Sequence, residues 1–245
     1  CADKYNFSRE QQDEFAIHSY EKSQRAQAQD IFKSEISPVI IKDRKGNEII
    51  IDQDEEPNRV NFDKISTLRP AFDKNGTITA ANASTINDGA AAILLTTLNI
   101  ATKLNKTPKA RIVAQASVAQ KPEWFTTAPI KAIKKVLDRA NLTIKDIDLF
   151  EINEAFSVVV LAAQKELDID SSKLNIYGGA VSLGHPIGAS GARIMCTLLN
   201  AMERKKVKYG LYNVGYGKPI KVKNLINKIV KKIKKGKPKF GSIKI

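Results

Sequence analysis

The sequence predicts an α/β fold in which strands and helices form packed layers. Three strand-like apolar segments, residues 110–117, 147–152 and 207–214, alternate with helix-like segments in the second half of the chain, and this alternation is typical of α/β layers. With 245 residues, 42% hydrophobic and 27% charged, the chain can bury a core and has a globular composition. Its apolar runs are shorter than the roughly 18–20 residues of a membrane span, so we expect no membrane partner.

The first quarter of the chain predicts one long helix and a hairpin. Ser8 has the properties of a helix N-cap, with Gln11 at the capping-box position, and it predicts a polar surface helix over residues 9–33. His18 lies on this helix among polar residues, where a solvated side chain is expected. Two isoleucine-rich segments flank the turn residues 43–47 and predict a β-hairpin over residues 39–51.

The remaining elements follow from small-residue runs and helical spacing. A run of small and polar residues at 79–87 precedes an apolar segment that predicts a strand at 90–95. Apolar residues recur at helical spacing over residues 129–141, and we expect further helices at 154–167 and 189–204. Small residues permit the close approach of a bulky ligand, and they equally suit a buried turn.

The net charge of +14 belongs to the end of the chain. Residues 218–245 contain eleven lysines and no acidic residue, so the rest of the chain is close to balance. Clustered lysines could attract nucleic acid or an anionic membrane surface. The same segment carries an apolar stripe at helical spacing. This favours solvated lysines on a docking helix, and we expect no nucleic-acid partner.

The cysteines and the first residues indicate the compartment. Cys1 and Cys196 are the two cysteines, too few for a disulfide framework or a metal site. The first residues show neither the basic nor the apolar region of a signal peptide. A cytoplasmic location is therefore expected. The chain does not begin with Met, which suggests that its start is missing or was processed.

A glycine-rich stretch, residues 175–193, surrounds His185 and is the main candidate for a functional site. Five glycines in it let the backbone pass close to a ligand or to another segment. Pro186 is followed by small residues that predict a helix start, where free N–H groups carry a partial positive charge. The stretch is either a packed strand–turn–helix corner or the wall of a binding site.

Asn153 and His185 are polar residues at two such corners. A neutral imidazole can take a proton from a thiol and can later donate to an oxyanion. An amide side chain can hold a water molecule in the same role. The pair suits acyl transfer, provided that a nucleophile is available.

Three segments of the sequence resemble the thiolases, the acetyl-CoA acyltransferases. They are Asn153-Glu-Ala-Phe, the glycine–histidine stretch ending at Arg193, and the run from Asn82 to Ala92. Their order matches too, and the resemblance covers about residues 1–211. It implies a layered α/β/α/β/α fold of two similar halves, assembled as a dimer or tetramer. Residues 1–107 would be an incomplete N-terminal domain with a hairpin and loop insertion, and residues 108–211 most of the C-terminal domain.

The resemblance also implies roles for individual residues. His185 would activate a cysteine that attacks an acyl-CoA thioester, and Asn153 would hold the water that shares the oxyanion with it. Ser84 would lie along the pantetheine arm, with Ala155 and Phe156 nearby. Arg59 would meet the coenzyme A phosphates, or would be an exposed loop arginine. Coenzyme A thioesters would be the substrates, with no metal or further cofactor.

Two departures from the family concern its cysteines. The family's nucleophilic cysteine belongs upstream of Ala2, and Cys1 does not match it. The second belongs to a Cys-x-Gly segment shortly after Leu211, where this sequence has residues 212–217 without cysteine. Cys196 lies in a helix-like apolar setting typical of a core. We therefore expect the chain to be catalytically incomplete. Alternatively, it is a non-catalytic CoA-binding fragment or a chimeric gene product.

Residues 212–245 resemble a different family. The segment that starts with Tyr212-Asn-Val-Gly-Tyr-Gly is similar to the C-terminal part of nucleotide-sugar epimerases and dehydratases. In that family a turn of this type precedes a helix near the sugar nucleotide. A basic, helical tail joined to a thiolase fragment, by gene rearrangement or by a sequence-assembly error, is therefore expected.

Overall fold

The helix that follows Ser8 is the longest element in the computed structural model, which describes residues 1–213. This helix, α2, spans Arg9–Ala28. The predicted capping box is confirmed, because Gln11 N donates to Ser8 Oγ at 3.2 Å and Ser8 N donates to the Gln11 side chain at 2.9 Å. The helix ends five residues before the predicted boundary, since Asp30 adopts a left-handed conformation with φ 53°.

As predicted, this polar helix presents exposed residues to solvent, but its opposite face is buried. Its buried residues are mostly polar: Gln12, Asp13, Ala16, Ser19, Tyr20, Ser23 and Ala26. Partners on the same helix and in distant segments bond to several of these groups. The Asp13 carboxylate accepts from Arg9 at 2.6 Å and from Asn82 at 2.8 Å, and Gln12 donates to Thr77 at 2.9 Å. A helix can bury a polar face when most of its polar groups find hydrogen bonds there. The helix sequence alone does not show these partners.

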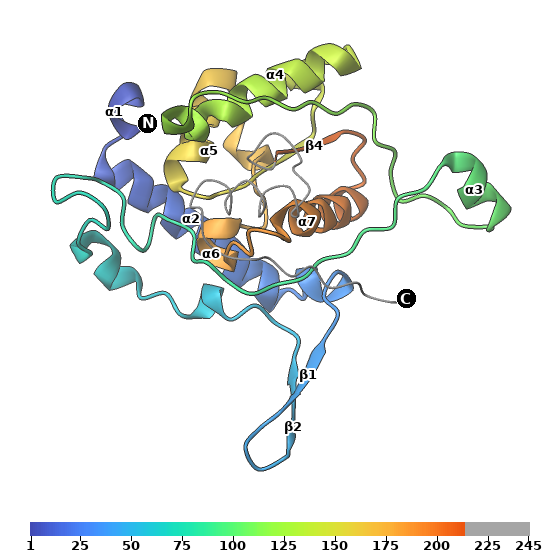
Figure 1. The fold of residues 1–245 in the computed structure, drawn as a ribbon, viewed down its shortest axis with the longest axis horizontal. Coiled ribbons are helices and arrows are strands. Elements are labelled where there is room, and N and C mark those ends of the chain that lie inside the picture. Colours follow the sequence, from blue (N-terminus) through green and yellow to red (C-terminus); the bar gives the residue numbers. More distant parts are fainter. Residues whose placement is uncertain (214–245) are drawn as a thin grey trace, which may run out of the picture.

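A two-stranded parallel sheet lies at the centre of the second half (Figure 1). Strand β3 (Leu149–Ile152) pairs with β4 (Gly210–Asn213) in parallel register. Alternate β3 side chains point to opposite faces. Phe150 packs with helices α4 (Ala128–Ala140) and α5 (Ser157–Leu167), whereas Leu149 packs against α7 (Ser190–Lys205). These helices on two faces of a sheet form the predicted α/β layers.

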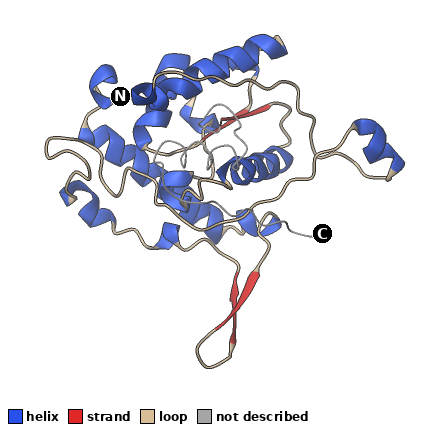
Figure 2. Ribbon diagram, viewed as in Figure 1, coloured by secondary structure: helices blue, strands red, loops and turns tan. Residues whose placement is uncertain are grey.

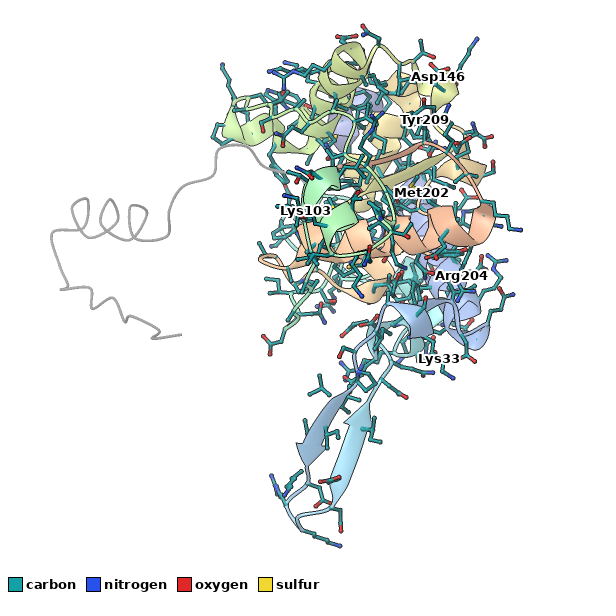
Figure 3. All side chains as sticks on the ribbon, turned by 90° about the vertical axis from the view of Figure 1, so that its right-hand side faces the viewer. Lys33, Lys103, Asp146, Met202, Arg204 and Tyr209 are labelled. Atoms are coloured by element: carbon teal, nitrogen blue, oxygen red, sulfur yellow. The ribbon has the colours of Figure 1, made fainter. Side chains whose placement is uncertain are left out.

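Close packing joins α7 to the start of β4. Met202 lies on α7, and Tyr209, also labelled in Figure 3, directly precedes β4. A Cβ atom at Gly210 would lie 2.5 Å from Met202 Sδ, so a larger residue there would require the Met202 side chain to move. The helices predicted at 129–141 and 189–204 are confirmed as α4 and α7. The strands predicted at 147–152 and 207–214 are confirmed in part, because β3 begins at Leu149 and β4 begins at Gly210. The helix predicted at 154–167 begins at Ser157, because Phe156 is extended.

The hairpin is confirmed and extends away from the rest of the chain (Figure 2). Strands β1 (Val39–Lys42) and β2 (Glu48–Ile51) pair antiparallel, and every residue in them is exposed. Asp43 closes the turn by accepting from the N–H groups of Lys45 and Asn47 at 2.8 and 2.9 Å. Isoleucine side chains therefore face solvent on both sides of a two-stranded sheet.

The predictions of strands at residues 90–95 and 110–117 are wrong. Neither segment forms a strand, and within residues 1–213 no neighbouring strand pairs with them. An apolar segment forms a strand only where a ladder partner satisfies its backbone. Without one, several large apolar side chains of these segments remain exposed: Leu94, Leu95, Ile112 and Val113. Helix α3 (Leu98–Lys103), which was not predicted, lies between the two segments and projects outward in Figure 1.

Short elements complete the part of the chain that the structure describes. Helices α1 (Ala2–Tyr5) and α6 (Ala180–Leu183) are four residues long. The 3₁₀ turns are Ile31–Ser34, Glu56–Asn58, Phe62–Thr67, Pro122–Thr127, Ile144–Asp146 and Ser171–Lys173. No helix among the described residues has the length and apolar character that crossing a membrane requires. The predicted helical tail, apart from its first two residues, lies outside the described residues.

Candidate functional site

The Glu154 side chain packs directly against the glycine-rich stretch, residues 175–193. Its carboxylate is buried and accepts from Ser19 Oγ at 2.7 Å, Asn175 Nδ2 at 2.7 Å and Val181 N at 3.1 Å. These donors tie α2, the end of β3 and α6 together. A Cβ atom at Gly179 would lie within 2.3–2.6 Å of the same carboxylate. The glycine therefore permits the turn to pass directly over Glu154.

The loop at Thr85 and Asn87 fixes the backbone of His185. His185 N donates to Thr85 O at 2.9 Å and lies 3.2 Å from Asn87 Oδ1. Gly184 precedes it with φ 89°, and a Cβ atom there would lie 2.3 Å from Asn87 Oδ1. The left-handed backbone and the contact with Asn87 both require glycine at this position. The run of small residues at 79–87 thus packs against the histidine turn.

The structure brings the predicted pair, Asn153 and His185, together. Asn153 Nδ2 lies 3.4 Å from His185 Nε2, and the other ring nitrogen, Nδ1, lies 2.6 Å from Ser190 Oγ. The imidazole is half-buried. Burial lowers its pKa below the usual value, and the positive charge of Arg193 lowers it further. His185 is therefore neutral near pH 7, which is the form that can accept a proton.

Asn153 offers an acceptor with no partner among residues 1–213. Its side chain is 6% exposed, and no hydrogen bond reaches Oδ1 in that part of the chain. Asn153 N donates to Asn213 O at 3.1 Å, so the end of β4 fixes its backbone. A buried carbonyl oxygen without a partner is costly. It is suited to accept from a water molecule or from a ligand N–H or O–H group.

The structure also brings Ser84, Ala155 and Phe156 together. Both the N–H and the hydroxyl of Ser84 donate to Ala155 O, at 3.1 and 3.0 Å. Ala83 pairs with Phe156 as an isolated antiparallel bridge. The Phe156 ring meets Phe125 edge-on at 6.2 Å between ring centres. The loop carrying Ser84 therefore lies against the segment that directly follows Asn153.

Arg59 is not brought to these residues directly. It is exposed and forms ion pairs with Glu55 and, at 3.1 Å, with Glu56. Glu56 in turn lies 3.5 Å from Asn87 Nδ2. Arg59 is thus linked to the loop at Thr85 and Asn87 only through a carboxylate. Its exposure agrees with the alternative expectation, an exposed loop arginine.

Neither cysteine lies in hydrogen-bond contact with His185 within residues 1–213. Cys1 Sγ lies 3.8 Å from Val158 O and packs against the core cluster of β3. Cys196 is half-buried on α7, and burial raises the pKa of its thiol. A raised thiol pKa keeps the group protonated and unreactive. The described residues also contain no group of three or more His, Cys, Asp or Glu arranged to hold a metal ion.

Sequence reasoning missed four residues that shape the site. Ser190 contacts the imidazole, Asn87 and Thr85 hold its backbone, and Glu154 supports the turn. All four lie in the segments that carry the family resemblance, with Thr85 and Asn87 in the run of small residues. Their position in these segments was the signal that the sequence offered. The sequence could not show which of those residues would meet.

Comparisons with known proteins agree with this fold. The family model described as "Thiolase, N-terminal domain" matches residues 1–99, and "Thiolase, C-terminal domain" matches residues 106–228. The chain is 51% identical over 211 residues to "Probable acetyl-CoA acetyltransferase" of Dictyostelium discoideum, covering 86% of this chain and 51% of that protein. It is 50% identical over 217 residues to "Acetyl-CoA acetyltransferase, mitochondrial" of Mus musculus, covering 88% and 51%.

Solved structures show the same similarity. The crystal structure of the Bacillus anthracis acetyl-CoA acetyltransferase matches with a TM-score of 0.83 and 38% identity, covering 87% of this chain and 55% of that one. Human mitochondrial 3-ketoacyl-CoA thiolase matches with a TM-score of 0.79 and 34% identity, covering 88% and 55%.

The chain belongs to the thiolase family. The thiolase-type α/β fold class predicted from the sequence is confirmed. The chain spans about half the length of the curated relatives that it matches.

Proposed function

We propose that the chain supplies the base and the oxyanion-binding groups of an acetyl-CoA acetyltransferase site. Such a site condenses two acetyl-CoA molecules, or cleaves a 3-ketoacyl-CoA with free CoA. The observation that carries this proposal is the contact between Asn153 and a neutral, half-buried His185 at 3.4 Å. The names of the relatives support the reaction type.

In the proposed reaction His185 Nε2 takes the proton of a thiol. The resulting thiolate attacks the thioester carbonyl carbon, and the carbonyl oxygen becomes an oxyanion. The imidazolium and a water molecule held by Asn153 donate to that oxygen. Collapse of the tetrahedral species expels the CoA thiolate, which takes the proton back from the imidazolium, and leaves the acyl group on the attacking sulfur. The attacking thiol is assigned to no residue of this sequence.

The proposed substrates are coenzyme A thioesters, with no metal or other cofactor. Ser84 and Ala155 would line the pantetheine arm, and the Phe156 ring would cover it. Their mutual contacts support this assignment. Arg59 would meet the phosphates only after leaving its carboxylate partners.

A second candidate function is CoA binding without chemistry. The observation that favours it is the position of the two thiols, neither of which bonds to His185 within residues 1–213. In this case the family site would hold acyl-CoA and release it unchanged.

One pair of measurements separates the two functions. Thiolysis of acetoacetyl-CoA that is abolished in His185→Ala and unchanged in His18→Ala supports the acyltransferase. Calorimetric binding of CoA without turnover, weakened several-fold in Ser84→Ala, supports the binding module. A chain that neither turns over acetoacetyl-CoA nor binds CoA contradicts both.

We further propose that the protein works as a homo-oligomer, a homotetramer, in the cytoplasm. Several relatives are named mitochondrial, so the location needs its own test. Light scattering of the purified protein and fractionation of the source cells measure the two properties. A monomer, or recovery in an organelle fraction, contradicts the respective proposal.

The epimerase-like origin of residues 212–245 also stays a proposal, as do the domain boundaries after residues 107 and 211. The C-terminal family match continues to residue 228, past the second boundary. Calorimetry with a nucleoside diphosphate sugar tests the epimerase relation, and absence of binding contradicts it.

A further inference from the structure

The Ser190 hydroxyl has one proton but contacts two polar atoms. Its Oγ lies 2.6 Å from His185 Nδ1 and donates to Pro186 O at 3.1 Å. A carbonyl oxygen can only accept, so the Ser190 proton must point to Pro186 if that bond is made. The hydroxyl lone pairs then remain for Nδ1, which must carry a proton in order to donate to them.

The opposite end of the ring fits the same arrangement. Asn153 presents Nδ2, a donor, to His185 Nε2 at 3.4 Å. A donor facing Nε2 requires a lone pair there. Asn153 therefore donates to Nε2, Nδ1 donates to Ser190, and Ser190 donates to Pro186. All three contacts are satisfied together only when the neutral ring is protonated at Nδ1.

The surroundings fix Ser190 in this geometry. Ser190 is fully buried and is the first residue of α7. Its backbone N–H also donates to Pro186 O, at 2.8 Å, so the serine and its carbonyl acceptor belong to the same turn. The bond from a serine hydroxyl to the carbonyl four residues earlier is a common local arrangement. The reverse arrangement would need the hydroxyl to abandon Pro186 and the Asn153 amide to turn over.

We propose that Ser190 is a positioning residue that holds His185 as the Nδ1–H tautomer and so keeps Nε2 unprotonated. The Nε2 lone pair, which faces Asn153, can then accept a proton when a thiol takes the place of the Asn153 donor. An unconstrained imidazole prefers the proton on Nε2, which would block the base. The hydrogen bond at the second ring nitrogen determines which tautomer is present. The catalytic consequence rests on the proposed acyltransferase function, but the tautomer itself does not.

Nuclear magnetic resonance can read the tautomer without any substrate. The chain contains only two histidines, and His18 is exposed. Protein labelled with ¹⁵N-histidine, in a His18→Gln background, gives the ring nitrogens of His185 alone. We expect a protonated, pyrrole-type Nδ1 and a lone-pair, pyridine-type Nε2 at neutral pH. A wild-type ring protonated at Nε2 overturns the proposal, whether or not any variant folds.

Matched variants test whether Ser190 is the cause. Ser190→Ala should shift His185 toward the Nε2–H tautomer, whereas Ser190→Thr, which keeps the hydroxyl, should preserve Nδ1–H. Ser182→Ala is the control, because Ser182 is equally buried but bonds to Ser19 and Gly179 instead of His185. An unchanged tautomer in a folded Ser190→Ala contradicts the proposal.

A kinetic readout applies if the protein shows thiolysis. Ser190→Ala should then lower kcat by about 10- to 100-fold, as for other residues that orient a functional histidine. KM should change little, because Ser190 does not line the proposed CoA path. A change in KM alone contradicts a positioning role. A correct tautomer in a protein without turnover would instead count against the proposed function only.

Discussion

Asn153 Nδ2 lies 3.4 Å from His185 Nε2, although 32 residues separate them in the sequence. The contact joins the end of β3 to the turn between α6 and α7. Glu154, the neighbour of Asn153, bonds to Val181 N in α6 and so holds the two segments together. The geometry of the pair therefore depends on a buried carboxylate that takes no part in the proposed chemistry.

This contact predicts the effect of Asn153→Asp. A carboxylate in place of the amide would favour the charged imidazolium, and a charge within hydrogen-bond reach raises a histidine pKa by about one to three units. We expect His185 to titrate at correspondingly higher pH in an NMR titration. His18, in the same spectrum, serves as the internal control. An unchanged His185 pKa would show that the two side chains do not meet in solution.

Gly179→Ala should destabilise the protein strongly. The new Cβ atom would overlap the Glu154 carboxylate, which is itself fixed by three hydrogen bonds. Overpacking of this kind costs about 1–3 kcal/mol of unfolding free energy, measured by urea denaturation. Gly188→Ala is the matched control, since nothing lies within 4 Å of its Cβ position. Equal effects of the two substitutions would argue against the close approach at Glu154.

Glu151→Gln should flatten the pH dependence of stability. Glu151 is 2% exposed, and burial raises its pKa from 4.5 to about 8, against the opposing charge of Arg193. Between these values the folded protein binds a proton that the unfolded chain has lost. Wild-type stability therefore falls as the pH rises from 4.5 toward 8, by up to about 1.4 kcal/mol per pH unit. Urea midpoints across this range measure the slope.

The glutamine variant should lose this part of the slope and be more stable than the wild type at pH 8. Glu48→Gln, at an exposed position of the hairpin, should keep the wild-type slope. A parallel shift of the whole curve in Glu151→Gln would contradict a raised pKa.

The hairpin should promote aggregation. Ile40 and Ile50 face each other across the strands and are 60% and 61% exposed, next to unpaired strand edges. We expect Ile40→Lys with Ile50→Glu, an oppositely charged cross-strand pair, to slow aggregation followed by light scattering. The free energy of unfolding should change by less than about 0.5 kcal/mol, as for surface positions.

Leu94→Lys with Leu95→Glu is the control for exposed apolar area without a strand edge. Leu94 is 91% exposed in a segment that forms no strand. If this control slows aggregation more than the hairpin variant does, exposed apolar area drives the association. A wild-type protein that stays monodisperse would contradict the prediction that the hairpin promotes aggregation.

The sequence by itself determined the elements whose signals are local. The capping box at Ser8, the turn at Asp43 and the spacing of α4 each involve residues a few positions apart, so the pattern alone predicts the element. It also indicated Asn153 and His185, because the Asn-Glu-Ala-Phe segment and the glycine-rich stretch each present one polar residue suited to acyl transfer. These predictions required no knowledge of what packs against what.

The tertiary structure decided everything that depends on distant partners. It buried the polar face of α2, because Asn82 and Thr77 supply hydrogen bonds that the helix sequence cannot show. It left residues 90–95 and 110–117 without strand structure, because strand formation needs a neighbouring ladder as well as apolar residues. It also placed Ser190 against His185 at 2.6 Å, because the turn after Pro186 folds back on the imidazole.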